Sequence, residues 1–449
     1  MVLARSGAQT GARVLRGTPH NSGKRLLVSP IIDSEPPFAD TLAGSPARAR
    51  AAAGTDLPVL KLRAHEERRL QAGHLWVFSN EIDVEATPLT AFTPGEAVRI
   101  HTSRDRFLGY GYVNPRTLIA ARILSRDPAH PVARPLFVHR LKVALALRER
   151  LYTTPHYRLV FGESDGLPGL VVDRYGEVCV AQLTTAGMEV RKAEILEALQ
   201  RTLKPRAVLW KNDSAVRELE GLPLEVAPAL GEIPDEVEVD EGGVGFRVPL
   251  AGGQKTGWFY DQTRNRAAVA ALCHGARVLD VFCYTGGFGL QALRAGAQSA
   301  LCVDASAAAL DLVTRTAAAH TLPVTTRRGD AFEVLEALAR EGERFDVVVV
   351  DPPAFIRRRK DHPKGLAAYR KLNQLAMQLV ERDGFLVSCS CSWHLAEGEL
   401  IEAIQRAARH VDRFAQLIEL RGQAPDHPVH PAIPETRYLK AVVARISHA

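Results

Sequence analysis

A glycine-rich turn stands between an apolar strand and a helix in residues 278–289. Glycines let a backbone approach a ligand closely, and a helix N-terminus favours anions and polar groups. The turn therefore predicts a ligand site, although a purely structural turn fits this segment alone equally well. A dinucleotide-binding Gly-x-Gly-x-x-Gly is absent. The ligand-contact candidates of the segment are Asp280, Phe282, Tyr284, Thr285, Gly286, Gly287 and Phe288.

Ligand-facing features mark the ends of three successive strands: the glycine-rich turn and two acidic residues. Asp304, 24 residues after Asp280, ends the second strand and can accept both hydroxyls of a ribose, with Ser306 beside it. Asp330 ends the third strand and can accept from an adenine amino group. Each of these aspartates also suits a helix N-cap. Together they predict an adenosine-containing cofactor.

A second constellation, residues 351–355, ends the strand 345–350. Pro352 and Pro353 fix φ and remove two amide donors, which makes the mouth of a site rigid. Phe355 can stack on a planar base, and Asp351 can hydrogen-bond the ring nitrogen or amino group of that base. The alternative is a strand terminator followed by a core phenylalanine.

Cys389 and Cys391 end the fifth strand, where a thiolate could attack an electron-poor carbon. Strand alternation puts both on one face and does not choose between them. Cys391 lies further toward the cleft edge and is the nucleophile candidate, with Asp351 as its catalytic partner. The six cysteines lack zinc-ligand spacing and are too sparse for a disulfide scaffold. They predict no metal site and a reducing, cytoplasmic compartment.

Two further segments adjoin these residues. Arg357, Arg358 and Arg359 form a basic loop that could grip phosphates or simply be solvated. Residues 258–266, just before the first strand, are expected to form a lid over the cofactor pocket, with Asp261, Gln262 and Arg266 contacting the cofactor. The alternative is an aromatic core patch. Residues 253–257 lack the order of a Walker A loop.

The elements that position these residues alternate between strand and helix. Strands are predicted at 277–282, 300–304, 324–327, 345–350, 385–389, 414–420 and 438–446, with helices at 288–295, 307–320, 331–339, 367–381 and 397–408. This order predicts an α/β, doubly wound, mostly parallel seven-stranded sheet.

The upstream part of the chain has a different texture. Alternating segments at 95–101, 107–113 and 117–123 predict a small β module. Strands at 169–176, 178–183 and 207–210 with a helix at 189–202 predict a compact α+β region.

Composition sets the outer bounds. The 449 residues are 46% hydrophobic and 24% charged, which is typical of globular chains rather than disordered or fibrous ones. The net charge of +6 suits a polyanionic partner without requiring one. No run approaches the roughly 20 apolar residues of a membrane span, so no membrane partner is expected.

These motifs resemble the large-subunit ribosomal RNA methyltransferase I family of class I S-adenosylmethionine-dependent enzymes. The resemblance covers residues 58–446 and rests on segments 255–266, 284–288, 303–306, 351–355 and 390–392, together with 162–176 upstream. It implies a PUA RNA-binding domain at 57–127, a central α+β domain at 128–250 and a Rossmann-like methyltransferase domain at 251–449. Residues 1–56 are then a poorly ordered extension, although their Arg-rich, acid-poor start also resembles a transit peptide.

The resemblance implies S-adenosylmethionine as cofactor and 23S ribosomal RNA as partner. It favours cytosine-C5 methylation, with Cys391 at the position of the family's catalytic cysteine. This chain departs from the family at Cys389, a second cysteine, and at Ala354, where lysine is common.

Several alternatives stay open. A guanine methyltransferase, or one acting on an exocyclic or ring nitrogen, would use Asp351 and the proline pair without a nucleophilic cysteine. A non-catalytic RNA-binding ribosome-assembly factor would bind RNA without turnover. A nicotinamide-dependent oxidoreductase would need the missing glycine fingerprint. Both a monomer and a homodimer are compatible with the sequence.

Overall fold

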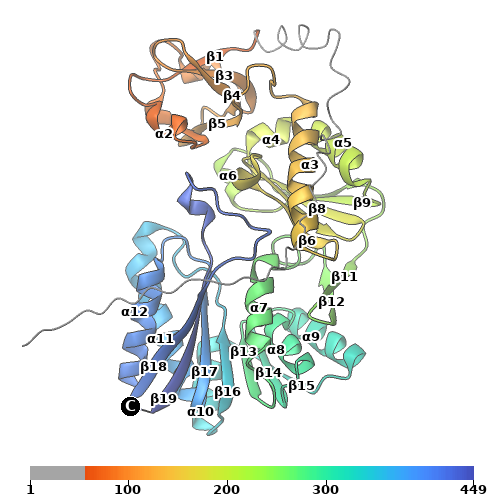
Figure 1. Ribbon diagram of the computed structural model, residues 1–449, viewed down its shortest axis with the longest axis vertical. Helices are drawn as coiled ribbons and strands as arrows, with labels where there is room; N and C mark the ends of the chain where they lie inside the picture. The colour runs from red at the N-terminus through yellow and green to blue at the C-terminus, as the bar shows by residue number, and fades with distance from the viewer. Residues whose placement is uncertain (1–55, 449) are drawn as a thin grey trace, which may run out of the picture. The chain divides into compact units, whose positions relative to one another are not determined.

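The computed structural model describes residues 56–448. The predicted extension at 1–56 therefore lies almost wholly outside the described residues. Three sheets of five, five and seven strands follow one another along the chain, with a two-stranded hairpin between the last two (Figure 1). Within the described residues no helix is long and apolar enough to cross a membrane.

The first sheet is the predicted β module. Its strands are β1 (Val59–Lys61), β2 (Trp76–Phe78), β3 (Glu96–His101), β4 (Phe107–Val113) and β5 (Ile119–Ser125), in the order β1-β3-β4-β5-β2, with the short helix α2 (Arg68–Gln71) beside them. A Cβ at Gly111 would lie 2.1 Å from the Arg122 carbonyl oxygen, so only glycine fits where β4 and β5 shift register.

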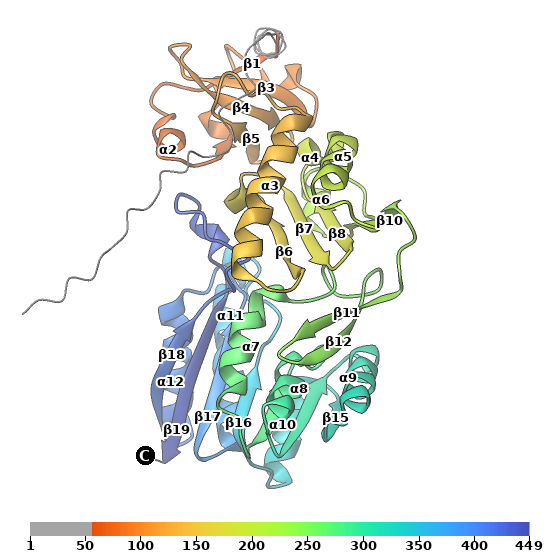
Figure 2. The same cartoon turned by 45° about the vertical axis from the view of Figure 1, so that its right-hand side comes forward.

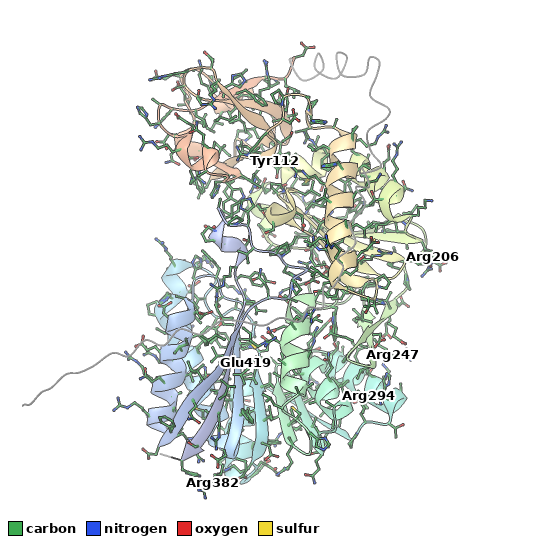
Figure 3. The ribbon with its side chains drawn as sticks, viewed as in Figure 1. Tyr112, Arg206, Arg247, Arg294, Arg382 and Glu419 are labelled. Atoms are coloured by element: carbon green, nitrogen blue, oxygen red, sulfur yellow. The ribbon has the colours of Figure 1, made fainter. Side chains whose placement is uncertain are left out.

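The second sheet is the predicted α+β region. It has the order β10-β9-β8-β7-β6, from β6 (His156–Phe161), β7 (Leu170–Tyr175), β8 (Val178–Leu183), β9 (Ala207–Asn212) and β10 (Glu225–Leu230). Its helices are α3 (Arg134–Leu151), α4 (Ala186–Val190), α5 (Lys192–Leu203) and α6 (Val216–Leu219). The side chain of Tyr112 on β4 (labelled in Figure 3) donates to the Pro168 carbonyl at 2.8 Å and so joins this region to the β module.

The helix predicted at 189–202 is interrupted at one residue. Arg191 leaves helical geometry with φ −101° and ψ 16° and divides α4 from α5. Its buried guanidinium donates to the carbonyls of Gly95 at 2.9 Å and Gly187 at 2.7 Å. The hydrogen bond to Gly95 joins residues far apart in the chain, so helical periodicity does not reveal the break.

The third sheet confirms the doubly wound prediction. Its order is β15-β14-β13-β16-β17-β19-β18, and all pairs are parallel except those of β19. The strands are β13 (Arg277–Val281), β14 (Ser299–Asp304), β15 (Val324–Arg328), β16 (Phe345–Val350), β17 (Val380–Ser390), β18 (Arg413–Arg421) and β19 (Lys440–His448). The hairpin β11 (Glu236–Glu241) and β12 (Val244–Pro249) precedes them. It was not among the predicted strands, although its apolar residues alternate on both sides of Gly242-Gly243, which is a hairpin signal.

Helices cover both faces of this sheet (Figure 2). One core cluster holds residues of α7 (Thr263–Ala270), α8 (Gly287–Arg294) and α9 (Ala307–His320). The other holds residues of α10 (Ala331–Arg340), α11 (His362–Leu379) and α12 (Glu397–His410). The buried strand Phe345–Val350 contributes Val347 and Val349 to the first cluster and Val348 and Val350 to the second, as alternation requires.

One predicted boundary is wrong. The helix predicted at 367–381 spans His362–Leu379, and β17 begins at Val380, inside the predicted range. Val380 already pairs with Phe345, and a register shift with the left-handed residue Asp383 (φ 63°) precedes the regular pairing from Phe385. This irregular start carries charged residues at 381–383, so the apolar pattern did not predict that the strand begins there.

Candidate active site

The predicted chemistry-bearing residues gather where parallel strands end. Val281 on β13 pairs with Val303 on β14 and with Val350 on β16, and Val350 pairs with Ser388 on β17. The strand order runs outward in both directions from β13 and β16, so this edge is the topological switch point at which α/β sheets bind ligands.

The glycine-rich turn is held in an uncommon backbone conformation. Phe282 (φ 63°) and Tyr284 (φ 48°) are left-handed without being glycine, and Gly286 (φ 81°) follows them. Such residues cost about 1–3 kcal/mol each and persist only where their surroundings enforce them. Two hydrogen bonds hold the conformation of Tyr284: its amide donates to Asp304 Oδ2 at 2.9 Å, and its hydroxyl donates to the Gly257 carbonyl at 3.0 Å.

The helix after the turn lies close against the strands. The Gly289 amide donates to Asp280 Oδ2 at 2.9 Å, and a Cβ at Gly289 would lie 2.7 Å from Cys302 Sγ. Thr285 is buried, and its hydroxyl has no hydrogen-bond partner among residues 56–448. Because buried hydroxyls are normally paired, the turn has the unsatisfied polar group that a bound adenosine cofactor would engage. Phe288 packs its side chain into the core.

Asp304 and Asp330, at the ends of the next two strands, also accept hydrogen bonds from backbone amides. Asp304 accepts from the amides of Tyr284 and Ser306, each at 2.9 Å, and each oxygen keeps a second lone pair for a ligand. Ser306 caps α9, and Asp330 caps α10 through the Phe332 amide at 2.9 Å. Ser306 and Asp330 thus make the helix N-cap contacts that were the alternative to ligand binding.

Asp351 is reached from the segment before α7. Gln262 Nε2 donates to Asp351 Oδ2 at 2.9 Å, and Asn265 Nδ2 donates to Gln262 Oε1 at 2.6 Å, which orients the amide. Burial, together with repulsion from Asp261, raises the pKa of Asp351 to about 7. Burial, together with repulsion from Asp351 and Asp304, also raises the pKa of Asp280 to about 7. Both carboxyl groups can therefore hold a proton near neutral pH.

The expected aromatic lid is wrong for two of its residues. Trp258 and Tyr260 are buried in the core, as the aromatic-patch alternative held, and Trp258 Nε1 donates to Glu241 Oε2 at 2.8 Å. Arg266, a predicted cofactor contact, pairs its guanidinium with Glu241 at 2.6 Å and stacks it over Trp258. Glu241 on β11 holds both Trp258 and Arg266 in these positions. Because Glu241 lies outside the predicted motif, the motif alone did not reveal these contacts.

The proline pair leads into an aromatic cluster. Pro352 is buried and Pro353 exposed. The half-buried ring of Phe355 lies 4.9 Å from that of Tyr369 and 6.2 Å from that of Phe332. Arg357, Arg358 and Arg359 follow as exposed residues, with Arg358 Nε 3.7 Å from Asp361 Oδ2. The loop is therefore open to a polyanion.

Burial distinguishes the two cysteines that alternation left equivalent. Cys389 is fully buried in the core, whereas Cys391, one residue past the end of β17, is partly exposed. Its neighbours are fixed, because Ser390 Oγ donates to the Tyr369 hydroxyl at 2.8 Å and that hydroxyl lies 2.9 Å from Ser392 Oγ. Burial raises the pKa of the Cys391 thiol, and the Lys255 ammonium opposes this.

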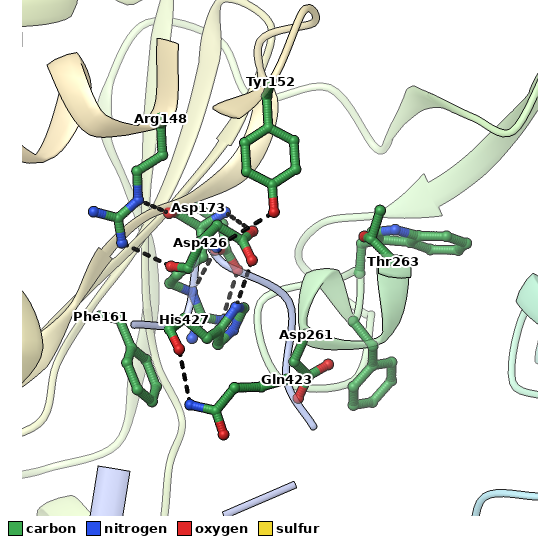
Figure 4. A network of polar contacts seen from close by, with 12 residues as sticks. Arg148, Tyr152, Phe161, Asp173, Asp261, Thr263, Gln423, Asp426 and His427 are labelled. Carbon is green, nitrogen blue, oxygen red and sulfur yellow. Dashed lines mark hydrogen bonds and ion pairs between the residues drawn. The ribbon is translucent and has the colours of Figure 1, made fainter. Parts of the chain in front are cut away.

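The long loop between β18 and β19 ties the site to the α+β region (Figure 4). Asp426 is fully buried; its carboxylate accepts from the Arg158 amide at 2.8 Å and its carbonyl from Arg148 Nη2 at 2.7 Å. His427 Nδ1 lies 2.9 Å from Asp426 Oδ1. Within the same loop the Ala424 amide donates to the Asp261 carbonyl at 2.8 Å, so the loop also positions the segment that carries Gln262.

Sequence reasoning missed several residues of this site. Glu241, Tyr369, Tyr438 and Lys440 all contact residues named above: Tyr438 hydrogen-bonds Asp261 Oδ2, and Lys440 hydrogen-bonds the Ser392 carbonyl. Only Lys440 left a signal, as a single cation directly before the apolar run 441–444.

Comparison with known proteins agrees with this architecture. Residues 60–126 match a PUA-like domain, and residues 180–445 match the model of S-adenosylmethionine-dependent methyltransferases. A putative methyltransferase from Streptococcus mutans superposes with a TM-score of 0.73 at 19% identity, covering 87% of this chain and all of that one. A putative methyltransferase solved with SAH gives 0.74 at 20% identity, with the same coverage. Fold and family model together define an S-adenosylmethionine-dependent methyltransferase with a PUA-like domain.

Curated relatives narrow the class. Ribosomal RNA large subunit methyltransferase I of Photobacterium profundum is 38% identical over 382 residues, covering 83% of this chain and 96% of that protein. The Aeromonas hydrophila protein of the same name is 38% identical over 389 residues, covering 84% and 97%. The chain belongs to the ribosomal RNA large subunit methyltransferase I family.

Proposed function

We propose that this protein methylates C5 of a cytosine in 23S ribosomal RNA, with S-adenosylmethionine as the methyl donor and Cys391 as a transient covalent nucleophile. One observation carries the choice of nucleophile: among residues 56–448, Cys391 is the one partly exposed cysteine, and it follows the end of β17, beside β16, which Asp351 follows. The relatives' name supports the RNA substrate, and the PUA-like domain agrees with it.

The cofactor site is proposed at the glycine-rich turn. Asp280, Asp304, Ser306, Asp330 and residues 282–288 surround the carboxyl ends of β13, β14 and β15. Asp261, Gln262 and Arg266 act from the segment before β13, where Gln262 bonds Asp351. When bound, the cofactor supplies an electrophilic methyl group on a sulfonium, whose positive charge suits a pocket of carboxylates.

The base is proposed to bind between Phe355 and the Ser-Cys-Ser turn. A flipped cytosine costs a few kcal/mol of stacking, which Phe355, Pro352 and Pro353 offset by packing on the ring. The Ile356 amide donates to Ser392 Oγ at 3.2 Å, so the loop that carries Phe355 is fixed to the turn that carries Cys391. Arg357, Arg358 and Arg359 grip flanking phosphates.

The chemical steps follow from these positions. The Cys391 thiolate forms a bond to C6, the π electron pair of the C5–C6 double bond shifts to form a C4–C5 double bond, and the displaced C4–N3 π pair takes a proton from Asp351 at N3. A carboxyl group with a pKa near 7 is able to give that proton at neutral pH. The bound cofactor would supply the methyl group to C5 and leave as the neutral thioether. N3 then returns its proton to Asp351, a base removes the C5 proton, the electron pair of that bond reforms the C5–C6 double bond, and the C6–S bond breaks to release the Cys391 thiolate.

A direct experiment tests this function. Purified protein is incubated with labelled S-adenosylmethionine and unmodified 23S rRNA, and the methylated nucleoside is identified by mass spectrometry. We expect 5-methylcytidine from the wild type and from Cys389→Ala, the matched control, and none from Cys391→Ala. Thermal unfolding of both variants checks that each is folded.

Other products would favour the alternatives. A methylated guanine, or activity retained in Cys391→Ala, would support nitrogen or guanine methylation through Asp351 without a thiolate. RNA affinity without any methyl transfer would support a non-catalytic assembly factor.

A further inference from the structure

A short loop, residues 254–258, is bound to the glycine-rich turn through the side chain of Tyr284. The Tyr284 hydroxyl accepts from the Gln254 amide at 3.3 Å and donates to the Gly257 carbonyl at 3.0 Å. Tyr284 is also one of the left-handed residues of the turn, with φ 48°. Since a side chain and its own backbone move together, the place of the loop and the conformation of the turn depend on one another.

The same loop is also bound to the second sheet. Tyr175, the last residue of β7, donates its hydroxyl to the Thr256 carbonyl at 3.1 Å and accepts from the Trp258 amide at 2.9 Å. The Thr256 hydroxyl hydrogen-bonds the buried carboxylate of Asp173, two residues earlier on the same strand. Two side chains of β7 therefore hold both the backbone and a side chain of the loop.

These contacts are shielded from water. Tyr175, Thr256 and Trp258 are each at most 3% exposed. One core cluster contains Tyr175 together with residues of α7, α8 and α9, so the second sheet and the methyltransferase sheet share a core. Burial raises the pKa of Tyr175 well above its ordinary value and the pKa of Tyr284 to about 12, so both hydroxyls keep the proton that they donate.

We propose that Tyr175 is a positioning residue for the cofactor: it fixes the loop 254–258, and the loop, through Tyr284, holds the glycine-rich turn in the conformation that binds S-adenosylmethionine. The inference rests on the proposed cofactor site. It also gives a physical role to the segment 173–176, on which the family resemblance rests in part. Without the Tyr175 hydroxyl, a buried carbonyl and a buried amide lose their partner, and the loop must shift to satisfy them.

Tyr175 is the contact that can be tested by itself. Among residues 56–448 its hydroxyl makes no hydrogen bond outside the loop. Asp173 instead pairs with Arg158 at 2.5 Å, so its replacement would leave a buried charge unpaired. Lys211 Nζ donates to the Ala251 carbonyl at 2.7 Å and so holds the chain ahead of the loop rather than the loop itself.

Ligand affinity tests the proposal without turnover. SAH is titrated into the full-length protein by calorimetry, in the absence of RNA. Tyr175→Phe keeps the ring, which lies 5.4 Å from that of Tyr260, and removes only the hydroxyl. We expect the variant's Kd for SAH to rise roughly fivefold, the scale of one net hydrogen bond. Hydrogen exchange of the amides of residues 254–258 should become faster in the same variant.

Tyr112→Phe is the matched control. The Tyr112 side chain is fully buried, and its hydroxyl donates to the Pro168 carbonyl at 2.8 Å and lies 2.9 Å from Thr185 Oγ1. Its loss should lower Tm about as much as the loss of the Tyr175 hydroxyl and leave the affinity for SAH unchanged. An equal loss of affinity in both variants would show a general effect of destabilisation and would overturn the proposal.

Two variants together test the path through the loop. Tyr284→Phe breaks the other hydroxyl contact of the loop. If Tyr175 acts through that contact, Tyr175→Phe should weaken SAH binding no further in a Tyr284→Phe background. Full additivity, or an unchanged affinity in folded Tyr175→Phe, would overturn the proposal. If Tyr175→Phe does not fold, exchange of the Trp258 amide decides: SAH should slow it in the wild type, and an unchanged rate would overturn the proposal.

A variant in the turn separates this inference from the proposed cofactor site. Asp304→Ala should weaken SAH binding because the site is proposed at the turn. A loss of affinity in Asp304→Ala without one in Tyr175→Phe would overturn the role of Tyr175 and keep the site. Unchanged affinity in Asp304→Ala would contradict the site and, with it, the role of Tyr175. None of these measurements uses RNA, so the choice of target base is tested separately.

Discussion

Gln262 and Asp351 are joined by a hydrogen bond of 2.9 Å across the top of the sheet, from the segment before α7 to the end of β16. They stand 89 positions apart in the chain. Asn265 holds the acceptor end of the same amide, so Gln262 can present only its donor to Asp351. The hydrogen bond lowers the pKa of Asp351 against burial, which raises it.

Removing the Gln262 donor should change the pKa of Asp351. In Gln262→Ala we expect the pKa of Asp351 to rise and the pH profile of methyl transfer to shift toward higher pH, with a loss of about tenfold in kcat/KM. The measurement is the initial rate of label transfer from pH 5.5 to pH 9. Gln182→Ala, which removes a donor to the Lys211 carbonyl in the α+β region, is the control and should leave the profile unchanged. An unshifted profile in Gln262→Ala would show that the bond does not tune Asp351.

Cofactor affinity should depend on pH. Asp280 and Asp351 both have pKa values raised to about 7, so below that pH they are largely neutral and above it negative. A sulfonium gains from negative carboxylates, whereas the neutral sulfur of SAH does not. We expect the affinity for S-adenosylmethionine to rise roughly tenfold from pH 6 to pH 8, about one proton released on binding, and the affinity for SAH to change less. Calorimetry with both ligands measures this, and equal pH slopes would contradict it.

The same raised pKa predicts a stability effect of known sign. A carboxyl group whose folded pKa lies above its unfolded value stabilises the fold below about pH 4, and that contribution is lost as pH rises through about 7. Asp280→Asn keeps an oxygen for the Gly289 amide and removes the titration. At pH 8 the ligand-free variant should therefore gain about 1 kcal/mol, a few degrees in Tm, and should gain nothing at pH 4. A variant with the same Tm shift at both pH values would exclude titration of Asp280 as the cause.

The buried hydrogen bonds of Asp426, in the loop between β18 and β19, should contribute strongly to stability. Asp426→Ala removes the acceptor of the Arg158 amide and the partner of His427, both in a buried setting. Loss of one partner from such a network costs roughly 3–5 kcal/mol. Denaturant unfolding measures the cost. Arg437→Ala, in the same loop but paired with Glu397 at the surface, should cost less than about 1 kcal/mol. Similar losses in the two variants would contradict the role of burial.

Gly289 should tolerate no side chain. A Cβ there meets Cys302 Sγ at 2.7 Å and Asp280 Oδ2 at 3.4 Å, so Gly289→Ala must push α8 away from β13 and β14. We expect about 1–3 kcal/mol of destabilisation and a loss of cofactor affinity. Gly398→Ala is the control, since Gly398 lies on α12 with nothing within 4 Å of its added Cβ. That variant should be neutral or more stable by up to about 1 kcal/mol.

The arginine loop should act on RNA alone. Replacing Arg357, Arg358 and Arg359 by alanine removes three exposed charges. We expect weaker RNA binding and a smaller dependence of affinity on salt, by about 0.7 in the logarithmic slope for each phosphate that the variant no longer neutralises. Affinity for S-adenosylmethionine should stay unchanged, which calorimetry checks. An unaltered salt slope would place the RNA elsewhere.

The sequence alone determined the sheet and the edge at which the chemistry lies. Continuous apolar runs and helical spacing are local properties, so the strand at 345–350 and the helix at 307–320 were predicted with the bounds that the structure has. Parallel strands bring their carboxyl ends to one edge, and this rule brought Asp280, Asp304, Asp351 and Cys391 together before any coordinates.

Only the tertiary structure decided which atoms meet across that edge. Alternation treated Cys389 and Cys391 alike, and burial separated them because one lies in the core and the other just past the strand end. Trp258 is a core residue whose indole donates to Glu241, and no pattern along the chain tells which distant carboxylate will accept from it. Lys440 reached the neighbours of Cys391 through an antiparallel pairing with a distant strand, because β19 returns between β17 and β18. Such contacts depend on register and packing between distant segments, which residue spacing does not encode.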